Sequence, residues 1–342
     1  MEYNEIFKTA LLLGIFFIFN KICLNLKIFL NDTSISEHKN FVLNNKNKVL
    51  ITGGFFLILG NMIYQKFFFL NLDNLFYVLI FCVGLFADVY KKFFPLLRIL
   101  FQILIVFLFI KIFNLMIKDV RISFINSILS KEFISVIFTI FCVIVLINGS
   151  NFIDGVNLST LSYYLLVLII VFILSKNNYF VLDLNFVKIQ IFLLSILLFF
   201  NFRNRVYLGD GGVYLVSFIT SVILIKFINN NTVISPYFAV LLLWYPCFEN
   251  LFSIVRRLLS NKKTQQADNC HLHHLIYLFF SKNNITYSSN LTGFLIFSFN
   301  FIILNLGYKF YNQTKYLVIL IFFSIFIYFC CYLYFRRLLV NK

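Results

Sequence analysis

Residues 133–155 read FISVIFTIFCVIVLINGSNFIDG, an apolar run that ends abruptly in a short polar segment. The apolar part, residues 133–147, approaches the roughly 20 residues that a helix needs to cross a bilayer. The polar part begins at Asn148 and ends with Asp154 and Gly155. We therefore expect a membrane-spanning helix that carries functional side chains at one end.

The whole chain repeats this alternation. Of its 342 residues, 61% are apolar, 20% aromatic and only 12% charged, whereas soluble globular domains carry about 25% charged residues. This composition predicts an all-α integral membrane protein in the lipid bilayer, a single polytopic domain over residues 1–342, with no nucleic-acid partner. About eleven apolar runs approach the length of a span. They are centred on residues 7–27, 49–65, 74–87, 97–117, 133–147, 161–176, 187–201, 212–228, 236–254, 290–308 and 317–335.

The first run and the cysteines add two expectations. Residues 7–27 include Lys21 and Lys27, and no small-residue cleavage site follows them, so a retained span is expected rather than a signal peptide. The seven cysteines fall mostly inside spans, where a thiol behaves as a small apolar group. We expect no disulfide framework.

The loops that follow odd-numbered spans share one face, because every crossing changes the side of the membrane. They are residues 31–40, 87–93, 148–157, 201–212 and 256–274. With the adjoining residues Lys46, Lys48, Arg98 and Lys282 and the C-terminal tail, they carry sixteen of the 29 Lys and Arg residues and every arginine except Arg121. The positive-inside rule makes this face cytoplasmic. A merely solvated surface is the alternative, but these loops are poor in Glu and rich in Asn, Gly, Asp and Arg.

Two of these loops place a carboxylate near basic residues. Residues 209–212 read GDGG and follow Arg205; glycines let a backbone approach an anion, and Asp210 can hold a hard cation. Asp88 precedes Arg98 and two lysines. The first motif is alternatively a simple turn, and the second an exposed ion pair of little energy. A metal ion shared by Asp88 and Asp210 would serve phosphoryl transfer.

Asn148, Asn151 and Asp154 are spaced at intervals of three, which places them near one face if the segment is helical. Asn offers donors and acceptors without charge and suits a nucleotide base or a sugar amide, while Asp154 can accept or coordinate. A helix-capping turn is the alternative, because Asn, Asp and Gly are preferred at helix ends.

A long predicted cytoplasmic loop, residues 255–289, carries three of the four histidines and two adjacent arginines. These are His271, His273, His274, Arg256 and Arg257. Together with Cys270 the histidines have the atoms of a zinc site, but ligands so close in sequence rarely close a tetrahedron. Imidazoles backed by arginines could instead bind a diphosphate and titrate near neutral pH. We favour this interpretation because it also accounts for Asp268.

Five motifs can be read together along the chain. They are His38 with Gly53 and Gly54; GLFAD at residues 84–88 with Arg98 and Gln102; Asn148, Asn151, Asp154 and Gly155; Arg205 with Gly209, Asp210 and Gly212; and Glu249, Arg256, Arg257, Ala267, Asp268, His271, His273 and His274. This set resembles the polyprenyl-phosphate N-acetylhexosamine-1-phosphate transferase superfamily, glycosyltransferase family 4. The histidine motif is more similar to the undecaprenyl-phosphate GlcNAc-1-phosphate transferase branch than to the peptidoglycan translocase.

The resemblance implies transfer of a sugar-1-phosphate from UDP-N-acetylhexosamine to undecaprenyl phosphate, with release of UMP. This would be the first membrane step of a cell-surface glycan such as O-antigen, at the inner membrane of a bacterium. It implies Mg²⁺, with Mn²⁺ as a substitute, held by Asp88, Asp154 and Asp210. The implied catalytic residues are Asp88, Asp154, Asp210, His271, His273 and His274, and the implied substrate-binding residues are Asn148, Asn151, Arg205, Arg256, Arg257 and Asp268. The sugar and a homodimer are left open.

Two departures from the superfamily pattern leave alternatives open. Position 87 is Ala where the superfamily usually has Asp, and Leu158-Ser159 replaces Gly-Leu after the Asn148 motif. A catalytically impaired member that still binds lipid is therefore one alternative. A lipid-phosphate transporter or flippase is another; it would need polar groups near the bilayer midplane and discontinuous helices.

Overall fold

A computed structural model describes residues 2–30, 49–65, 68–90, 94–259 and 270–340. This part of the chain is built of helices, and its only β pairing is a pair of isolated bridges, Leu30 with Leu50 and Leu50 with Val206. The all-α prediction is confirmed.

The helices follow the apolar runs of the sequence. They are α1 (Glu2–Leu26), α3 (Gly53–Tyr64), the short 3-10 helix η1 (Phe68–Leu70), α4 (Leu72–Val89), α5 (Pro95–Phe113), α6 (Ser123–Leu129), α7 (Glu132–Ile153), α8 (Ser159–Asn178), α9 (Leu184–Phe202), α10 (Gly209–Asn230), α11 (Pro236–Leu242), α12 (Trp244–Leu259), α13 (Leu272–Lys282), α14 (Ser288–Lys309) and α15 (Thr314–Val340).

Within the described residues, nine helices are long and apolar enough to cross a membrane, or ten if the bent pair α11 and α12 counts as one span. The expected span at residues 49–65 is instead the 12-residue helix α3. This helix starts late because its first N–H groups bond to another loop: Gly53 donates to the Tyr207 carbonyl (3.0 Å) and Gly54 to that of Leu208 (3.2 Å).

The expected span at residues 236–254 is broken, with a bend of 72° between α11 and α12. Pro246 explains the break, because a proline ring clashes with the carbonyl four residues earlier, here that of Leu242. The freed carbonyl accepts a hydrogen bond from the Tyr163 hydroxyl (2.8 Å). On α7, Gly149 makes room for the bend, since a Cβ there would lie 2.1 Å from the Pro246 oxygen.

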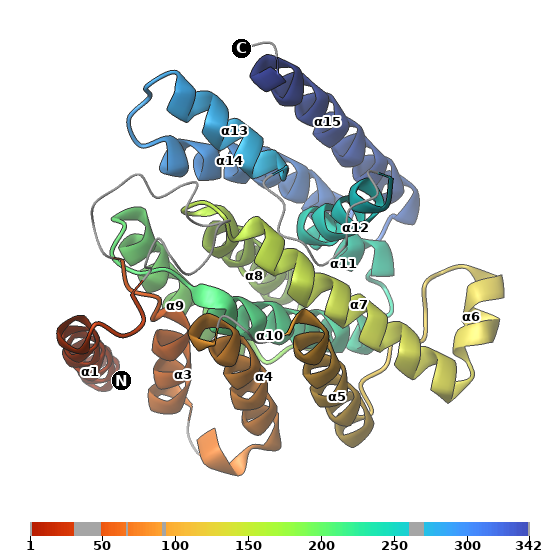
Figure 1. Ribbon diagram of the computed structural model, residues 1–342. Coiled ribbons are helices and arrows are strands. Elements are labelled where there is room, and N and C mark those ends of the chain that lie inside the picture. The colour runs from red at the N-terminus through yellow and green to blue at the C-terminus, as the bar shows by residue number, and fades with distance from the viewer. Residues whose placement is uncertain (1, 31–48, 66–67, 91–93, 260–269, 341–342) are drawn as a thin grey trace.

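Helix α10 is the centre of the bundle and is buried along nearly its whole length. In Figure 1, α3, α4 and α5 lie on one side of α7 and α10, and α13, α14 and α15 lie on the other. The backbones of α4 and α10 touch, because a Cβ on Gly84 would lie 2.5 Å from the Cα of Gly211. This close packing fixes the first turn of α10 against the last turn of α4.

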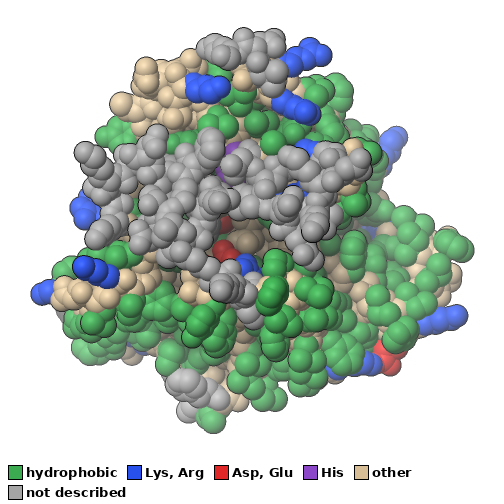
Figure 2. Space-filling model, viewed as in Figure 1, with side chains coloured by type: hydrophobic (Ala, Val, Ile, Leu, Met, Phe, Trp, Pro, Cys, Tyr) green, Lys and Arg blue, Asp and Glu red, His purple; other side chains and the backbone are tan. Residues whose placement is uncertain are grey.

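The outer surface of the bundle is apolar, as the green side chains of Figure 2 show. Phe17, Phe133 and Phe322 are 71%, 74% and 66% exposed, which suits contact with hydrocarbon rather than water. At the end of the bundle away from the predicted site, Arg121 donates to the carbonyls of Asn312, Thr232 and Val233. Arg121 thus joins three loops of that end.

The predicted long loop at residues 255–289 is partly helical. Helix α12 continues to Leu259, and α13 covers Leu272–Lys282. Residues 260–269, which include Asp268, lie outside the described residues. Helix α13 lies within the predicted loop and directly follows the polar segment in which the histidine motif begins.

Candidate active site

The last turn of α4 meets the first turn of α10 through Asp88. One carboxylate oxygen accepts from the N–H of Asp210 (3.0 Å) and the other from the N–H of Gly211 (3.1 Å). These N–H groups have no partner inside their own helix, and the helix dipole favours negative charge there. Gly209 has a left-handed φ of +73°, and a Cβ on it would lie 2.8 Å from Asp88. The GDGG motif therefore lets a carboxylate cap α10.

Helix α5 joins this carboxylate pair to α7. Arg98 and Gln102 lie one helical turn apart on α5. Nη1 of Arg98 is 3.5 Å from a carboxylate oxygen of Asp210, and the buried Gln102 accepts a hydrogen bond from the Asn148 side chain (2.9 Å). The GDGG and Asn148 motifs, far apart in the sequence, are thus held by neighbouring side chains of one helix.

The end of α7 touches the histidine motif. Asn148 and Asn151 lie on the last turns of α7, and Asp154 follows directly after its final residue, as the spacing predicted. The next residue, Gly155, packs against two imidazoles: a Cβ there would lie 2.2 Å from Nε2 of His273 and 2.8 Å from Nε2 of His274. Only glycine allows this approach.

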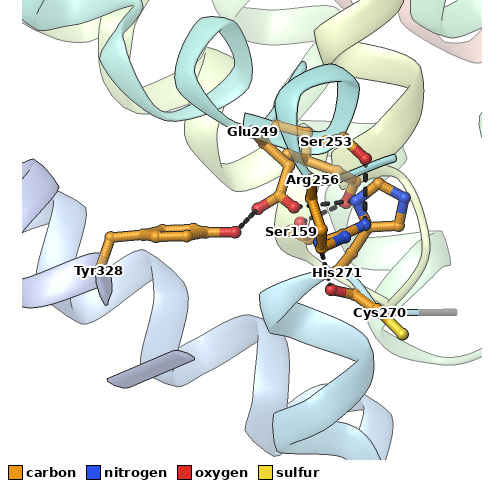
Figure 3. Close-up of polar contacts among 8 residues, drawn as sticks. Ser159, Glu249, Ser253, Arg256, Cys270, His271 and Tyr328 are labelled. Atoms are coloured by element: carbon orange, nitrogen blue, oxygen red, sulfur yellow. Dashed lines mark hydrogen bonds and ion pairs between the residues drawn. The ribbon is translucent and has the colours of Figure 1, made fainter. Parts of the chain in front are cut away.

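The three histidines form a buried cluster at the start of α13. The ring centroids of His271 and His273 are 5.6 Å apart, and those of His273 and His274 are 4.1 Å apart. Nδ1 of His271 lies 2.8 Å from the fully buried carboxylate of Glu249 on α12. The second oxygen of Glu249 accepts from the Tyr328 hydroxyl of α15 (2.7 Å). Figure 3 shows Glu249 between these two partners.

The two arginines of α12 hold the surroundings of His271. Arg256 donates to the Cys270 carbonyl (2.6 Å) and to the Ser253 hydroxyl (3.1 Å), which ties α12 to the start of α13 (Figure 3). The guanidinium of Arg257 lies over the Phe152 ring at 5.4 Å, and this ring is 5.1 Å from that of His271. Both arginines are therefore next to the imidazole cluster.

Several buried polar atoms of this region have no hydrogen-bond partner within the described part of the chain. They are the side-chain oxygen of Asn151, the side-chain nitrogen of Gln102 and both ring nitrogens of His273. Buried polar groups are normally paired, so a cluster of exceptions needs an explanation. A polar substrate that supplies the missing partners would explain all of them.

Burial lowers the pKa of His273 well below its ordinary value, and the neighbouring rings of His274 and His271 lower it further. His273 is fully buried, so the cost of desolvating its charged form dominates. A neutral imidazole offers one donor and one acceptor to a ligand.

The structure does not bring every predicted residue to this cluster. Arg205 is exposed and lines a separate cavity near the end of α9. Asp268 lies outside the described residues. In Figure 2, acidic and basic side chains are visible side by side near the centre of the face, and histidine is visible above them on the same face.

The donor set bears on the predicted metal. Within the described ranges, no three His, Cys, Asp or Glu side chains are grouped as metal ligands would be, which supports neither the zinc alternative nor a metal site that joins Asp154 to Asp88 and Asp210. Mg²⁺ needs only one or two carboxylates when substrate phosphate and water complete its shell. Asp88 accepts the backbone N–H of Asp210, so both acids lie where α4 meets α10, and two carboxylates there fit Mg²⁺ without a third.

Sequence reasoning missed Tyr328, which lies in the last span with no motif around it. Glu249 was noted only as part of a motif, although an acid inside an apolar run is itself a signal of function. Gln102 was noted in the same way, and the sequence could not reveal that it bonds to Asn148.

The part of the chain that carries most of this site is similar to known proteins. The family model described as Glycosyl transferase family 4 matches residues 74–228, which include Asp88, Arg98, the Asn148 motif and Asp210. A Bacillus subtilis (strain 168) protein named "Probable undecaprenyl-phosphate N-acetylglucosaminyl 1-phosphate transferase" is 29% identical over 145 residues, which is 41% of this chain and 40% of the relative. The alignment thus spans less than half of either protein. Residues 74–228 are therefore similar to glycosyl transferase family 4, in agreement with the resemblance of the motifs.

Proposed function

We propose that the protein transfers N-acetylhexosamine-1-phosphate from a UDP-sugar to undecaprenyl phosphate and releases UMP. The observation that supports this most is the link made by α5, where Arg98 contacts Asp210 and Gln102 contacts Asn148. This link joins a carboxylate pair suited to a metal–diphosphate to amides and imidazoles suited to a nucleotide sugar. The printed name of the relative agrees with this reaction.

In the proposed reaction, an oxygen of the lipid phosphate attacks the β-phosphorus of the UDP-sugar. The bond from this phosphorus to the bridging oxygen breaks, and UMP leaves with that oxygen and its electron pair. The lipid phosphate needs little deprotonation near neutral pH, since the second pKa of a phosphate monoester is about 6. Ala87, in place of the usual Asp, is compatible with this chemistry.

The residues of the chain have distinct roles in this proposal. Asp88 holds the first turn of α10, and Asp210 presents its carboxylate next to it. Mg²⁺ bound there would neutralise charge on the diphosphate. Arg98 adds positive charge beside Asp210, while Asn151 and His273 supply the unpartnered donors and acceptors that hold the nucleotide sugar.

The proposed location is the inner membrane of a bacterium, with this face toward the cytoplasm. UDP-sugars are soluble and charged, so they must arrive from water. The arginine distribution supports the same orientation through the positive-inside rule. The place of the reaction as the first membrane step of a surface glycan follows from the acceptor, a lipid that carries no sugar yet.

A transporter would share one feature, the broken helix α11–α12. The break frees the carbonyl of Leu242, and this carbonyl already accepts a hydrogen bond from Tyr163. It therefore does not need a transported ligand as its partner. We therefore prefer the transferase.

The test is UMP release by purified protein with undecaprenyl phosphate, Mg²⁺ and separate UDP-N-acetylhexosamines. We expect release that requires the lipid, stops with EDTA and prefers one sugar. Asp210→Asn should abolish it, whereas Asp183→Asn, an exposed carboxylate on the opposite face that caps α9, should not. No release with any donor, from protein that still binds the lipid, would contradict the proposal and favour the impaired-enzyme or flippase alternative.

A further inference from the structure

A cavity opens on the same face of the bundle as the candidate active site, between the end of α9 and the start of α14. Its volume is about 620 Å³, and the residues that line it include Arg203, Asn204, Arg205, Asn290, Leu291 and Phe294. Ligand pockets usually measure about 300–1,000 Å³. None of Asp88, Asp210, Asn148 or the three histidines lines it, so it is distinct from the candidate active site.

The rim of this cavity is basic. Arg203 and Arg205 are both exposed, and none of the described residues that line the cavity is acidic. The guanidinium of Arg203 lies over the Phe199 ring, 4.6 Å from its centroid. Both arginines line the cavity, and arginine binds phosphate oxygens with paired N–H groups.

The wall of the cavity is a network of asparagines. The buried Asn157 donates from one side-chain nitrogen to Asn204 and to Asn290, and Asn290 donates to the Phe202 carbonyl (3.0 Å). This network holds the loop after α9 against the first turn of α14. Two helix ends in a fixed arrangement thus form the cavity. Its shape there does not depend on the rotamers of the exposed arginines.

The apolar lining of the cavity is exposed at the outer surface of the bundle. Phe202, Leu291 and Phe294 are 52%, 39% and 57% exposed, and they belong to helices that are long and apolar enough to span a membrane. A ligand here would contact hydrocarbon-facing side chains below and arginines above. An amphiphile with an anionic head matches both parts.

We propose that this cavity binds an anionic glycerophospholipid of the surrounding bilayer, with its phosphate between Arg203 and Arg205 and its chains along Leu291 and Phe294. This site goes beyond the proposed transferase reaction and does not depend on it. The alternative is that the arginines only set the orientation of the chain in the membrane. That alternative requires no particular lipid and no cavity.

Native mass spectrometry of the full-length protein in detergent, with phosphatidylglycerol or phosphatidylcholine added, tests the site. We expect one phosphatidylglycerol to be retained in preference to phosphatidylcholine. The double variant R203Q/R205Q should lower this retention by about tenfold or more, as about 1 kcal/mol per interfacial arginine implies. R336Q/R337Q, which removes two exposed arginines at the end of α15, should leave it unchanged.

A second variant tests the cavity without changing charge. Leu291→Trp should fill its apolar part and lower the retention of phosphatidylglycerol while both arginines remain. The proposal is wrong if R336Q/R337Q loses as much lipid as R203Q/R205Q, or if phosphatidylcholine binds equally well. It is also wrong if undecaprenyl phosphate is retained and phosphatidylglycerol is not, because the cavity would then belong to the substrate.

Discussion

The carboxylate of Glu249 lies 2.8 Å from Nδ1 of His271, and neither side chain is exposed to more than a few per cent. A carboxylate beside one ring nitrogen fixes the orientation of an imidazole and determines which nitrogen faces the ligand. Tyr328 in turn holds the second oxygen of Glu249. The last helix, outside the family match, therefore helps to position the histidine motif.

Replacing Glu249 by Gln keeps its shape but removes the charge next to His271. We expect kcat for UMP release to fall by about 10- to 100-fold, as loss of an orienting partner does at metal-bound histidines, with a smaller change in KM. Tyr328→Phe should have a weaker effect in the same direction. Tyr334→Phe, the same change at an exposed position of α15, is the control. Full activity in Glu249→Gln would show that the pair is only structural.

Asp88 and Asp210 should respond differently to substitution because only Asp88 caps a helix. Asp88→Ala removes the acceptor for two N–H groups and should cost about 1 kcal/mol of stability. We expect its Tm to fall by a few degrees together with its activity. Asp210→Asn should lose activity with Tm nearly unchanged. Thermal unfolding in detergent alongside the UMP assay separates the two effects, and a D210N variant that unfolds first would contradict this assignment.

Gly155→Ala should disrupt the active site without disturbing the bundle. The added Cβ would lie 2.2 Å from His273 and 2.8 Å from His274, so both rings must move. A displacement of about 1 Å at a catalytic group can cost roughly 100-fold in rate. Gly14→Ala is the matched control, since nothing lies within 4 Å of the new atom. Equal activity of the two variants would show that the histidines take no part in turnover.

His273 should make stability depend on pH, because its pKa in the folded protein is lowered by burial and by its two histidine neighbours. At a pH above the ordinary pKa of about 6.5, His273 is neutral in both the folded and the unfolded chain. It then contributes nothing to the pH dependence of stability. Below that pH the unfolded chain binds a proton that the folded chain does not, so stability falls as pH decreases. Tm measured from pH 7.5 to 5 should fall more steeply for the wild type than for His273→Asn. Parallel curves would refute this.

The sequence predicted the helices and the common face of the motifs because both follow from short-range rules. Apolar runs determine spans, and the parity of spans places Asp88, Asn148 and Asp210 at the same end. The three-residue spacing correctly placed Asn148 and Asn151 on the end of α7. These features need no knowledge of how one helix packs against another.

The contacts that complete the site depend on packing and could not be predicted. The bend at Pro246 carries Glu249 toward His271, and the contact of Gly155 with His273 depends on how α13 lies against the end of α7. Pro246 was visible as a break in the run at residues 236–254, and a shorter span could have been predicted there. Nothing in the sequence around Tyr328 indicates that its hydroxyl meets Glu249.

The central claim is that a phosphorus atom, and not only a sugar, moves to the lipid. The most direct measurement uses a UDP-N-acetylhexosamine labelled with ³²P at the β-phosphate, together with undecaprenyl phosphate and the purified protein. The transferase account predicts that the label is extracted with the lipid as unlabelled UMP appears, and that Asp210→Asn prevents both. Label that stays in released UDP while the sugar moves to the lipid would show a different reaction and would contradict the account.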